Sequence, residues 1–229
     1  MRMTHGGKIF LLLSVMFASS VLFSQPAHPD ESQAIKTVIH QLLSENSDFV
    51  KKHDAKFFAP FVERQHPDVT VLMCSDSRVQ VHSFDTLPDN DLFVIRNIGN
   101  QLVTSEGSVE YGVHHLHTPI LLIVGHVRCG AIQAALGNYS KESPAIQKEL
   151  TTIHIKKGGE WLASVKINVN NQVKASEEKF KAEVDEGILA VVGAVYDFAD
   201  DLHGGFGKLS IINVNGETDP QKIKTLIGD

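Results

Sequence analysis

Short apolar runs alternate with longer amphipathic segments along most of this chain. The uninterrupted apolar run 120–124, which Pro119 opens, is typical of a parallel strand that is covered on both faces. Four further strand candidates share this apolar character: 69–73, 92–95, 188–198 and 208–213. Strands that alternate with helices predict an α/β fold with a mostly parallel central sheet, and the closing hairpin predicts one antiparallel edge strand.

Helical periodicity precedes and separates these strands. Apolar residues three and four apart predict an N-terminal helical arm that begins near residue 33 and continues to about 52. Asp30 or Ser32 can cap this helix, and its apolar face must pack on the domain or on a neighbouring subunit. Further helices are expected to flank the sheet at 105–116, at 129–136 and over 143–181, where the Asn-rich interval 168–171 fits no clear pattern.

The first residues have the pattern of a targeting segment. Arg2 and Lys8 precede an apolar stretch, and small residues follow it, which predicts a signal peptide over 1–24 with cleavage near 24–27. A membrane anchor is the alternative, but the stretch is shorter than the roughly 20 residues of a spanning helix. We therefore expect an exported protein without a membrane partner after cleavage, periplasmic in a Gram-negative source and otherwise secreted. Residues 30–229 are then expected to form a single domain.

The composition narrows the possible partners. With 42% hydrophobic and 21% charged residues, the chain reads as an ordinary globular domain. The formal net charge is −6, and no run of Lys and Arg forms a basic patch, so we expect no nucleic-acid partner.

The only two cysteines, Cys74 and Cys129, stand at or just after the ends of two predicted strands, and His126 precedes the second by three residues. Two thiolates and one imidazole suit Zn²⁺ in tetrahedral geometry. Three protein ligands with a vacant position are typical of a catalytic rather than a structural zinc site. The alternative is a disulfide between the two cysteines, which the oxidising environment of an exported protein permits.

Asp76 and Arg78 follow the first cysteine at two-residue steps. The carboxylate can be a fourth metal ligand, or it can accept a hydrogen bond from the metal-bound hydroxide. The guanidinium can hold that carboxylate by a bidentate pair and keep it off the metal. The alternative is an ordinary surface ion pair.

Cys-x-Asp-x-Arg followed by His-x-x-Cys resembles the β-class carbonic anhydrases, and the resemblance covers essentially the whole chain from residue 32. It implies one Zn²⁺ per chain and reversible hydration of CO2 to bicarbonate and a proton by zinc-bound hydroxide. It also implies a homodimer or homotetramer with active sites at the subunit seam. The positions that it assigns are these: zinc ligands Cys74, His126 and Cys129, catalytic dyad Asp76 and Arg78, and substrate-binding residues Gln65, Phe93, Tyr111 and Gly130.

Some members of that family close the site by swinging the aspartate onto zinc, and they carry a tryptophan three residues before the first cysteine. Val71 stands there in this chain, so the resemblance implies the open form. Two other functions stay open: a related zinc hydrolase that acts on CS2 or COS, and a non-catalytic zinc-binding protein.

Overall fold

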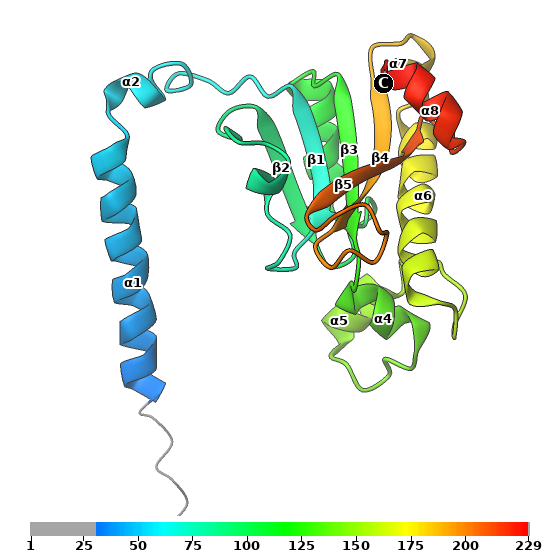
Figure 1. Ribbon diagram of the computed structural model, residues 1–229, viewed down its shortest axis with the longest axis horizontal. Coiled ribbons are helices and arrows are strands. Elements are labelled where there is room, and N and C mark those ends of the chain that lie inside the picture. The colour runs from blue at the N-terminus through cyan, green and yellow to red at the C-terminus, as the bar shows by residue number, and fades with distance from the viewer. Residues whose placement is uncertain (1–30, 229) are drawn as a thin grey trace, which may run out of the picture. The chain divides into compact units, whose positions relative to one another are not determined.

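The computed structural model describes residues 31–228, and they form two compact units that meet in sequence between Phe58 and Ala59 (Figure 1). Each unit is described by itself. The predicted signal peptide and the candidate cap Asp30 lie outside the described residues.

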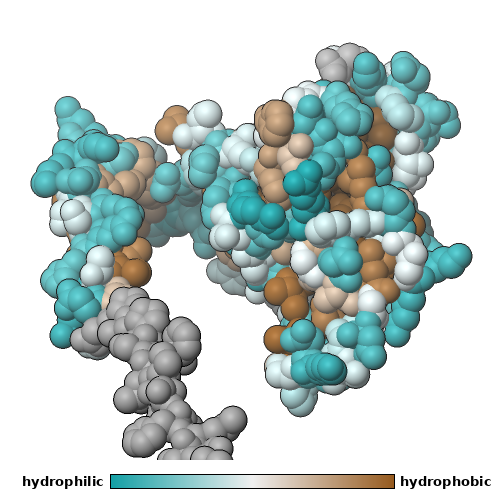
Figure 2. Space-filling view, turned by 60° about the horizontal axis from the view of Figure 1, so that its bottom comes forward, coloured by the Kyte–Doolittle hydropathy of each residue, from teal (hydrophilic) through white to brown (hydrophobic). Residues whose placement is uncertain are grey.

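The N-terminal unit consists of helix α1 (Glu31–Lys52) and the single turn α2 (Ala55–Phe58). The predicted arm is thus one continuous helix. Its apolar face is exposed, because α1 has no buried residue and Ile35, Val38 and Leu42 each expose more than half of their surface. Apolar side chains of this helix are visible at the left of Figure 2. Within the described part of the N-terminal unit, no residue covers that face.

The second unit is built on a five-stranded sheet with the order β2-β1-β3-β4-β5. All neighbouring strands are parallel except β4 and β5, which are antiparallel, so the predicted sheet is confirmed. Its strands are β1 (Val69–Cys74), β2 (Leu92–Asn97), β3 (Ile120–His126), β4 (Ala190–Asp197) and β5 (Lys208–Val214).

Helical elements connect and flank these strands. They are η1 (Val81–Ser83), α3 (Glu106–Glu110), η2 (Tyr111–His115), α4 (Gly130–Leu136), α5 (Pro144–Leu150), α6 (Trp161–Lys179), α7 (Lys181–Asp185) and α8 (Pro220–Ile227). Among the helices that the structure describes, none is both long and apolar enough to span a bilayer.

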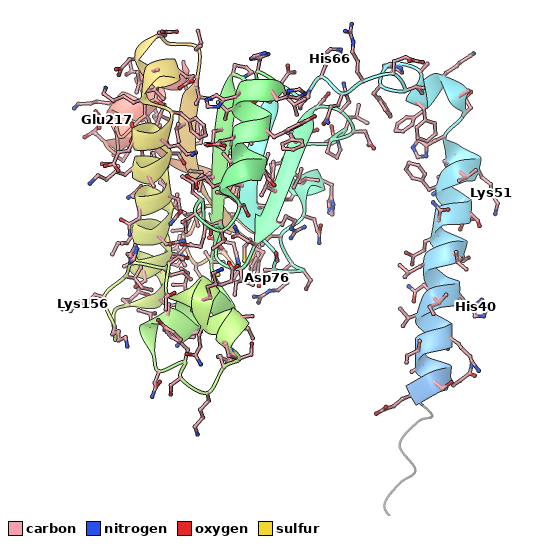
Figure 3. The ribbon with its side chains drawn as sticks, turned by 180° about the vertical axis from the view of Figure 1, so that it is seen from behind. His40, Lys51, His66, Asp76, Lys156 and Glu217 are labelled. Carbon is pink, nitrogen blue, oxygen red and sulfur yellow. The ribbon has the colours of Figure 1, made fainter. Side chains whose placement is uncertain are left out.

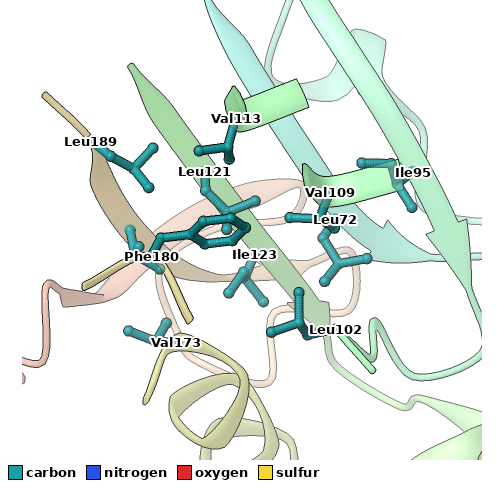
Figure 4. Close-up of a cluster of buried hydrophobic side chains, with 11 residues drawn as sticks. Leu72, Ile95, Leu102, Val109, Val113, Leu121, Ile123, Val173, Phe180 and Leu189 are labelled. Carbon is teal, nitrogen blue, oxygen red and sulfur yellow. The ribbon is translucent and has the colours of Figure 1, made fainter. Parts of the chain in front are cut away.

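The core lies on both faces of the sheet, because successive strand residues point to opposite sides. Leu72 belongs to a buried cluster with Ile123 and Phe180, which joins the sheet to α3, η2 and α6 (Figure 4). Its neighbour Val71 lies in a separate cluster on the other face. Helix α6 approaches the sheet closely, since a side chain at Gly125 would meet Val169 of α6 at 2.5 Å.

One predicted helix, 105–116, differs in form. It begins at Glu106 but continues as the π-helical turn η2, and the amide of Leu116 donates to the carbonyl of Tyr111. Gly112 lies so close to β1 that a Cβ there would stand 2.0 Å from Thr70 Oγ1. Thr118 Oγ1 also donates to the Gly112 carbonyl at 3.2 Å. The π-helical turn is thus in close contact with Thr70 and Thr118, and local periodicity does not reveal such contacts.

The predicted helical stretch 143–181 is divided into α5, α6 and α7. The Asn-rich interval lies inside α6, where its side chains bond to other segments: Asn168 Nδ2 donates to the Gly99 carbonyl and Asn171 Nδ2 to that of His154. Helix α8 was not predicted from the sequence. Its signal was Asp219 followed by Pro220, since Asp219 accepts hydrogen bonds from the first amides of the helix.

Candidate metal centre

The strand order brings the three predicted metal ligands together. β1 and β3 are parallel neighbours, so the terminal residues Cys74 and His126 lie at the same edge of the sheet. Cys129 follows three residues later, directly before α4. The ligand atoms of all three lie within 4.8 Å of one another. Figure 3 shows Asp76 at this edge, where α4 and α5 lie below the sheet.

The geometry of this Cys-His-Cys group fits zinc. The sulfur atoms of Cys74 and Cys129 are 3.9 Å apart, and both thiols are free and buried. Two sulfurs at about 2.3 Å from one tetrahedral zinc stand about 3.8 Å apart, whereas bonded sulfurs are about 2.05 Å apart. The arrangement therefore matches two ligands of one ion and not the disulfide alternative.

The imidazole of His126 has the form that a metal ligand requires. Its Nδ1 bonds to the carbonyl of Val127 at 2.9 Å, which assigns the proton to Nδ1. Nε2 is left with a free lone pair and is fully buried, with no hydrogen-bond partner within residues 31–228. A buried polar atom without a partner is costly, and a metal ion would satisfy it.

The pKa values of the two thiols also favour metal binding. The hydrogen bond from Cys129, more than the nearby His126, lowers the pKa of Cys74 to about 4 although the thiol is buried. The backbone amide of Gly99 contributes, with its nitrogen 3.4 Å from the Cys74 sulfur. The same thiol contact raises the pKa of Cys129. A lowered pKa favours the thiolate of Cys74, and thiolate is the ligand form of cysteine.

Asp76 and Arg78 form the predicted bidentate pair. Arg78 Nε donates to Asp76 Oδ1 at 2.9 Å, and Arg78 Nη2 donates to Oδ2 at 2.7 Å. These hydrogen bonds lower the pKa of Asp76 to about 2. Asp76 Oδ2 lies 3.8 Å from His126 Nε2, so the carboxylate borders the metal position while Arg78 holds it. This location and the bidentate geometry argue against an incidental surface pair.

Other residues support this dyad, and their role was not predicted from the sequence. The Arg78 guanidinium stacks 4.5 Å above the ring of Phe198 and also donates to the Arg128 carbonyl at 3.2 Å. Arg128 has a φ of 55° and forms a bidentate pair with Asp201. No local pattern could have linked Phe198 or Asp201 to the site, because both come from the loop after β4.

The ligand loops are held on their other sides as well. Trp161 Nε1 donates to the carbonyl of Cys129 at 3.0 Å, so the N-terminal end of α6 supports the ligand that precedes α4. Arg96 of β2 donates to several carbonyls of the loop that carries Asp76. The position of Arg96 directly after an apolar strand, at the edge where ligands are expected, was the available signal.

Two of the predicted substrate residues, Phe93 and Tyr111, lie away from the metal ligands of this chain. Phe93 pairs with Thr70, whereas Cys74 pairs with Asn97, so Phe93 stands four residues, about 13 Å, before the level of the cysteine. Tyr111 lies beside Phe93, with ring centroids 5.8 Å apart. The chain thus brings these two aromatic residues together but not to its own metal ligands.

The other two predicted substrate residues differ in position. Gln65 is exposed and precedes β1. Gly130 begins α4 next to Cys129, and a Cβ there would meet nothing within 4 Å. Gly130 therefore borders open space beside the ligands, while the substrate roles of all four residues remain predictions.

Comparisons with known proteins agree with the site. The sequence pattern of the carbonic anhydrase family matches residues 69–204, which include all three ligands and the dyad. A carbonic anhydrase of Emericella nidulans is 37% identical over 90 residues, or 38% of this chain and 40% of the relative. Carbonic anhydrase 2 of Mycobacterium tuberculosis is 37% identical over 73 residues, or 31% of this chain and 35% of the relative. The alignments thus span well under two thirds of these relatives.

Solved structures share the fold over a longer range. One of two tetrameric β-carbonic anhydrases from Sordaria macrospora superposes with a TM-score of 0.65 and 22% identity, covering 77% of this chain and 98% of its own. A Coccomyxa β-carbonic anhydrase in complex with acetazolamide gives a TM-score of 0.64 and 24% identity, covering 81% of this chain and 90% of its own. At these identities the likeness concerns the fold alone.

Proposed function

Because this chain belongs to the carbonic anhydrase family, we propose that it catalyses the reversible hydration of CO2 to bicarbonate and a proton with one Zn²⁺ per chain. The observation that supports this most directly is the buried Cys74-His126-Cys129 group with the Asp76 carboxylate beside it. A bound zinc would supply Lewis acidity that lowers the pKa of coordinated water and yields a nucleophile at neutral pH.

The protein's own groups have separate tasks in this proposal. The Asp76 carboxylate, ionised because Arg78 lowers its pKa, accepts a hydrogen bond from the attacking oxygen and so directs a lone pair toward the substrate carbon. Arg78 keeps the carboxylate in that orientation through two parallel hydrogen bonds. Ligation alone would require neither residue, which argues for catalysis over zinc storage.

The substrate pocket is completed by a second copy of the chain. Phe93 lies about 13 Å from the level of Cys74 along the sheet, and Tyr111 lies beside Phe93, so a single chain does not place them at its own ligands. β2 is an edge strand of the sheet, and Val94 on it is 39% exposed. An antiparallel approach of two β2 edges would bring Phe93 of one copy toward the Asn97 end of the other. Such a dimer also agrees with the exposed apolar face of α1.

The first test is stopped-flow CO2 hydration by the purified protein, with zinc measured in the same sample. We expect rapid hydration that a chelator abolishes and that zinc restores. Stoichiometric zinc without hydration from about pH 7 to pH 9 would contradict the proposal. Hydrolysis of COS or CS2 by that same sample would then support the related-hydrolase alternative.

The shared pocket has a separate test. Asp76→Asn impairs the metal side of a site and Phe93→Ala impairs the pocket side, so each variant alone is expected to be weakly active. Co-expressed chains would form mixed dimers in which one site has both intact halves, and activity should rise above the sum of the two variants. Additive activity in an assembly that is verified as mixed would exclude a pocket shared between chains.

Export completes the proposal. It rests on the pattern of residues 1–24, which lie outside the described residues. N-terminal sequencing of the protein from a fractionated bacterial host should find a new terminus near residues 25–28 in the periplasmic or secreted fraction. Intact Met1 in the cytoplasm would contradict export.

A further inference from the structure

Arg96 makes an unusual set of hydrogen bonds with the segment that carries the dyad. Its Nη2 lies 2.9 Å from the Cys74 carbonyl, 2.8 Å from that of Asp76 and 2.7 Å from that of Val79. Its Nε also donates to the Cys74 carbonyl at 3.1 Å, and Nη1 donates to Gln80 Oε1 at 3.2 Å. One half-buried guanidinium thus donates hydrogen bonds to main-chain carbonyls along the whole length of this loop.

The loop depends on these bonds because it lies between β1 and η1, outside regular structure. The carbonyls of Cys74, Asp76 and Val79 turn toward one point, and a cation there offsets their mutual repulsion. Arginine offers five N–H groups in a rigid plane, whereas lysine offers three on a flexible stem. A lysine at position 96 would keep the charge but would not span the same set of oxygens.

The geometry points to Arg96 as a positioning residue that fixes the main chain of residues 75–79 and thereby aims the Asp76 carboxylate at Arg78 and away from the metal ligands. Arg96 contacts no ligand side chain and acts through Asp76. This inference rests on the proposed function for its activity readout only, because its effect on the loop exists without turnover.

The first arm of the test compares Arg96→Lys in two backgrounds. In the otherwise natural protein, we expect kcat to fall about 10- to 100-fold with KM nearly unchanged and zinc content retained, as for groups that orient a metal site from behind its ligands. In an Asp76→Asn background, the same substitution should change kcat less than about twofold, because nothing is left to position. An equal loss in both backgrounds would overturn the inference.

The second arm needs no activity. Hydrogen exchange of the metal-free protein should be faster in Arg96→Lys for peptides that cover 75–79 and unchanged for the β5 peptide 208–214, which serves as the internal reference. Arg96→Met, which removes the charge as well, should accelerate the same peptides further. If Arg96→Met does not fold, Arg96→Lys alone decides. Unchanged exchange in 75–79 would contradict the inference.

The third arm measures whether the Asp76 carboxylate binds the metal, from the visible spectrum of the Co²⁺-substituted protein. In the Co²⁺-substituted natural protein, Asp76 is held by Arg78, whereas in Arg96→Lys the freed carboxylate is expected to reach the metal and to change the visible absorption spectrum. Asp76→Asn in the same variant should restore the original spectrum. A spectrum that Arg96→Lys leaves unchanged would count against control of Asp76. If the natural protein does not hydrate CO2, only the proposed function fails, since the exchange and cobalt arms still test Arg96.

Discussion

Arg78 binds Asp76 through both carboxylate oxygens, at 2.9 and 2.7 Å, while one of those oxygens stands 3.8 Å from Nε2 of His126. The carboxylate is therefore close enough to affect anything bound at the metal position, yet it is committed to the guanidinium. Both facts lead to the first prediction.

Asp76→Asn should keep zinc and lose activity. The amide has nearly the same shape but turns an NH2 group toward Arg78 or toward the attacking oxygen, so both hydrogen bonds cannot persist. We expect a loss of about 10- to 100-fold or more in kcat. Stopped-flow hydration and metal analysis on the same sample measure this, and a fully active zinc-loaded variant would refute the role of Asp76.

Removal of zinc should destabilise the protein. A ligand that binds only the folded state contributes about 2.7 kcal/mol when its free concentration is 100 times its Kd. A chelator should therefore lower the Tm, and added zinc should restore it. Cys129→Ser provides the matched control, since it removes one buried ligand and should make the Tm insensitive to both treatments. A chelator effect of equal size in that variant would place the metal elsewhere.

Substitution by alanine should have different effects on stability at two glycines, Gly112 and Gly130. A Cβ at Gly112 would stand 2.0 Å from Thr70 Oγ1, which predicts a loss of about 1–3 kcal/mol or more in the free energy of unfolding. At Gly130 a Cβ meets nothing within 4 Å, so stability should change by less than about 0.5 kcal/mol.

Gly130→Ala nevertheless tests the substrate space, because the added methyl group extends beside the metal ligands. We expect a lower kcat/KM at unchanged stability. Urea unfolding measures the difference in stability between Gly112→Ala and Gly130→Ala. CO2 hydration kinetics then measure kcat/KM of Gly130→Ala. Unchanged kinetics in Gly130→Ala would remove Gly130 from the predicted substrate residues.

Glu177 predicts a pH dependence of stability. Burial, and to a lesser extent the charge of Glu178, raises the pKa of the Glu177 carboxyl in the folded protein. Since an acid with a raised pKa holds its proton longer when folded, this group reduces stability as pH rises above its ordinary pKa of 4.5. Glu177→Gln should therefore stabilise the protein at pH 7 but not at pH 4.

Chemical denaturation at the two pH values measures this difference. Glu178→Gln is the matched control, and it should give a smaller gain at pH 7 because it removes only the lesser cause. A gain of equal size for Glu177→Gln at pH 4 and pH 7 would show that titration of this carboxyl is not responsible.

The features that could be predicted from the sequence are clearest at the ends of β1 and β3. The apolar runs and the polar residues directly after them predict the strands, their parallel order and the meeting of Cys74 with His126, because these depend on local pattern and on a general rule of α/β sheets. The π-helical turn at Tyr111 was not predictable, since it contains a glycine that packs against Thr70 in another element, and local periodicity does not reveal that contact.

The support of the dyad was not predictable for the same reason. Phe198 and Asp201 reach the site from a loop after β4, more than a hundred residues beyond Arg78 in the chain. Their own neighbours carry no signal of that contact. The candidate catalytic and metal-binding residues could be predicted from residue type and spacing. The residues that hold them in place could be identified only from the three-dimensional structure.

The hydrogen bond from His126 to the carbonyl of Val127 does not depend on the type of the neighbouring side chain. Its acceptor belongs to the main chain, so no replacement of the side chain at residue 127 deletes it. The imidazole tautomer that presents Nε2 is thus insulated from most single mutations, whereas the Asp76 carboxylate depends on side chains that one codon change can remove. Substitution of Val127 should therefore leave the tautomer of His126 unchanged, whereas substitution of Arg78 should change the orientation of the carboxylate.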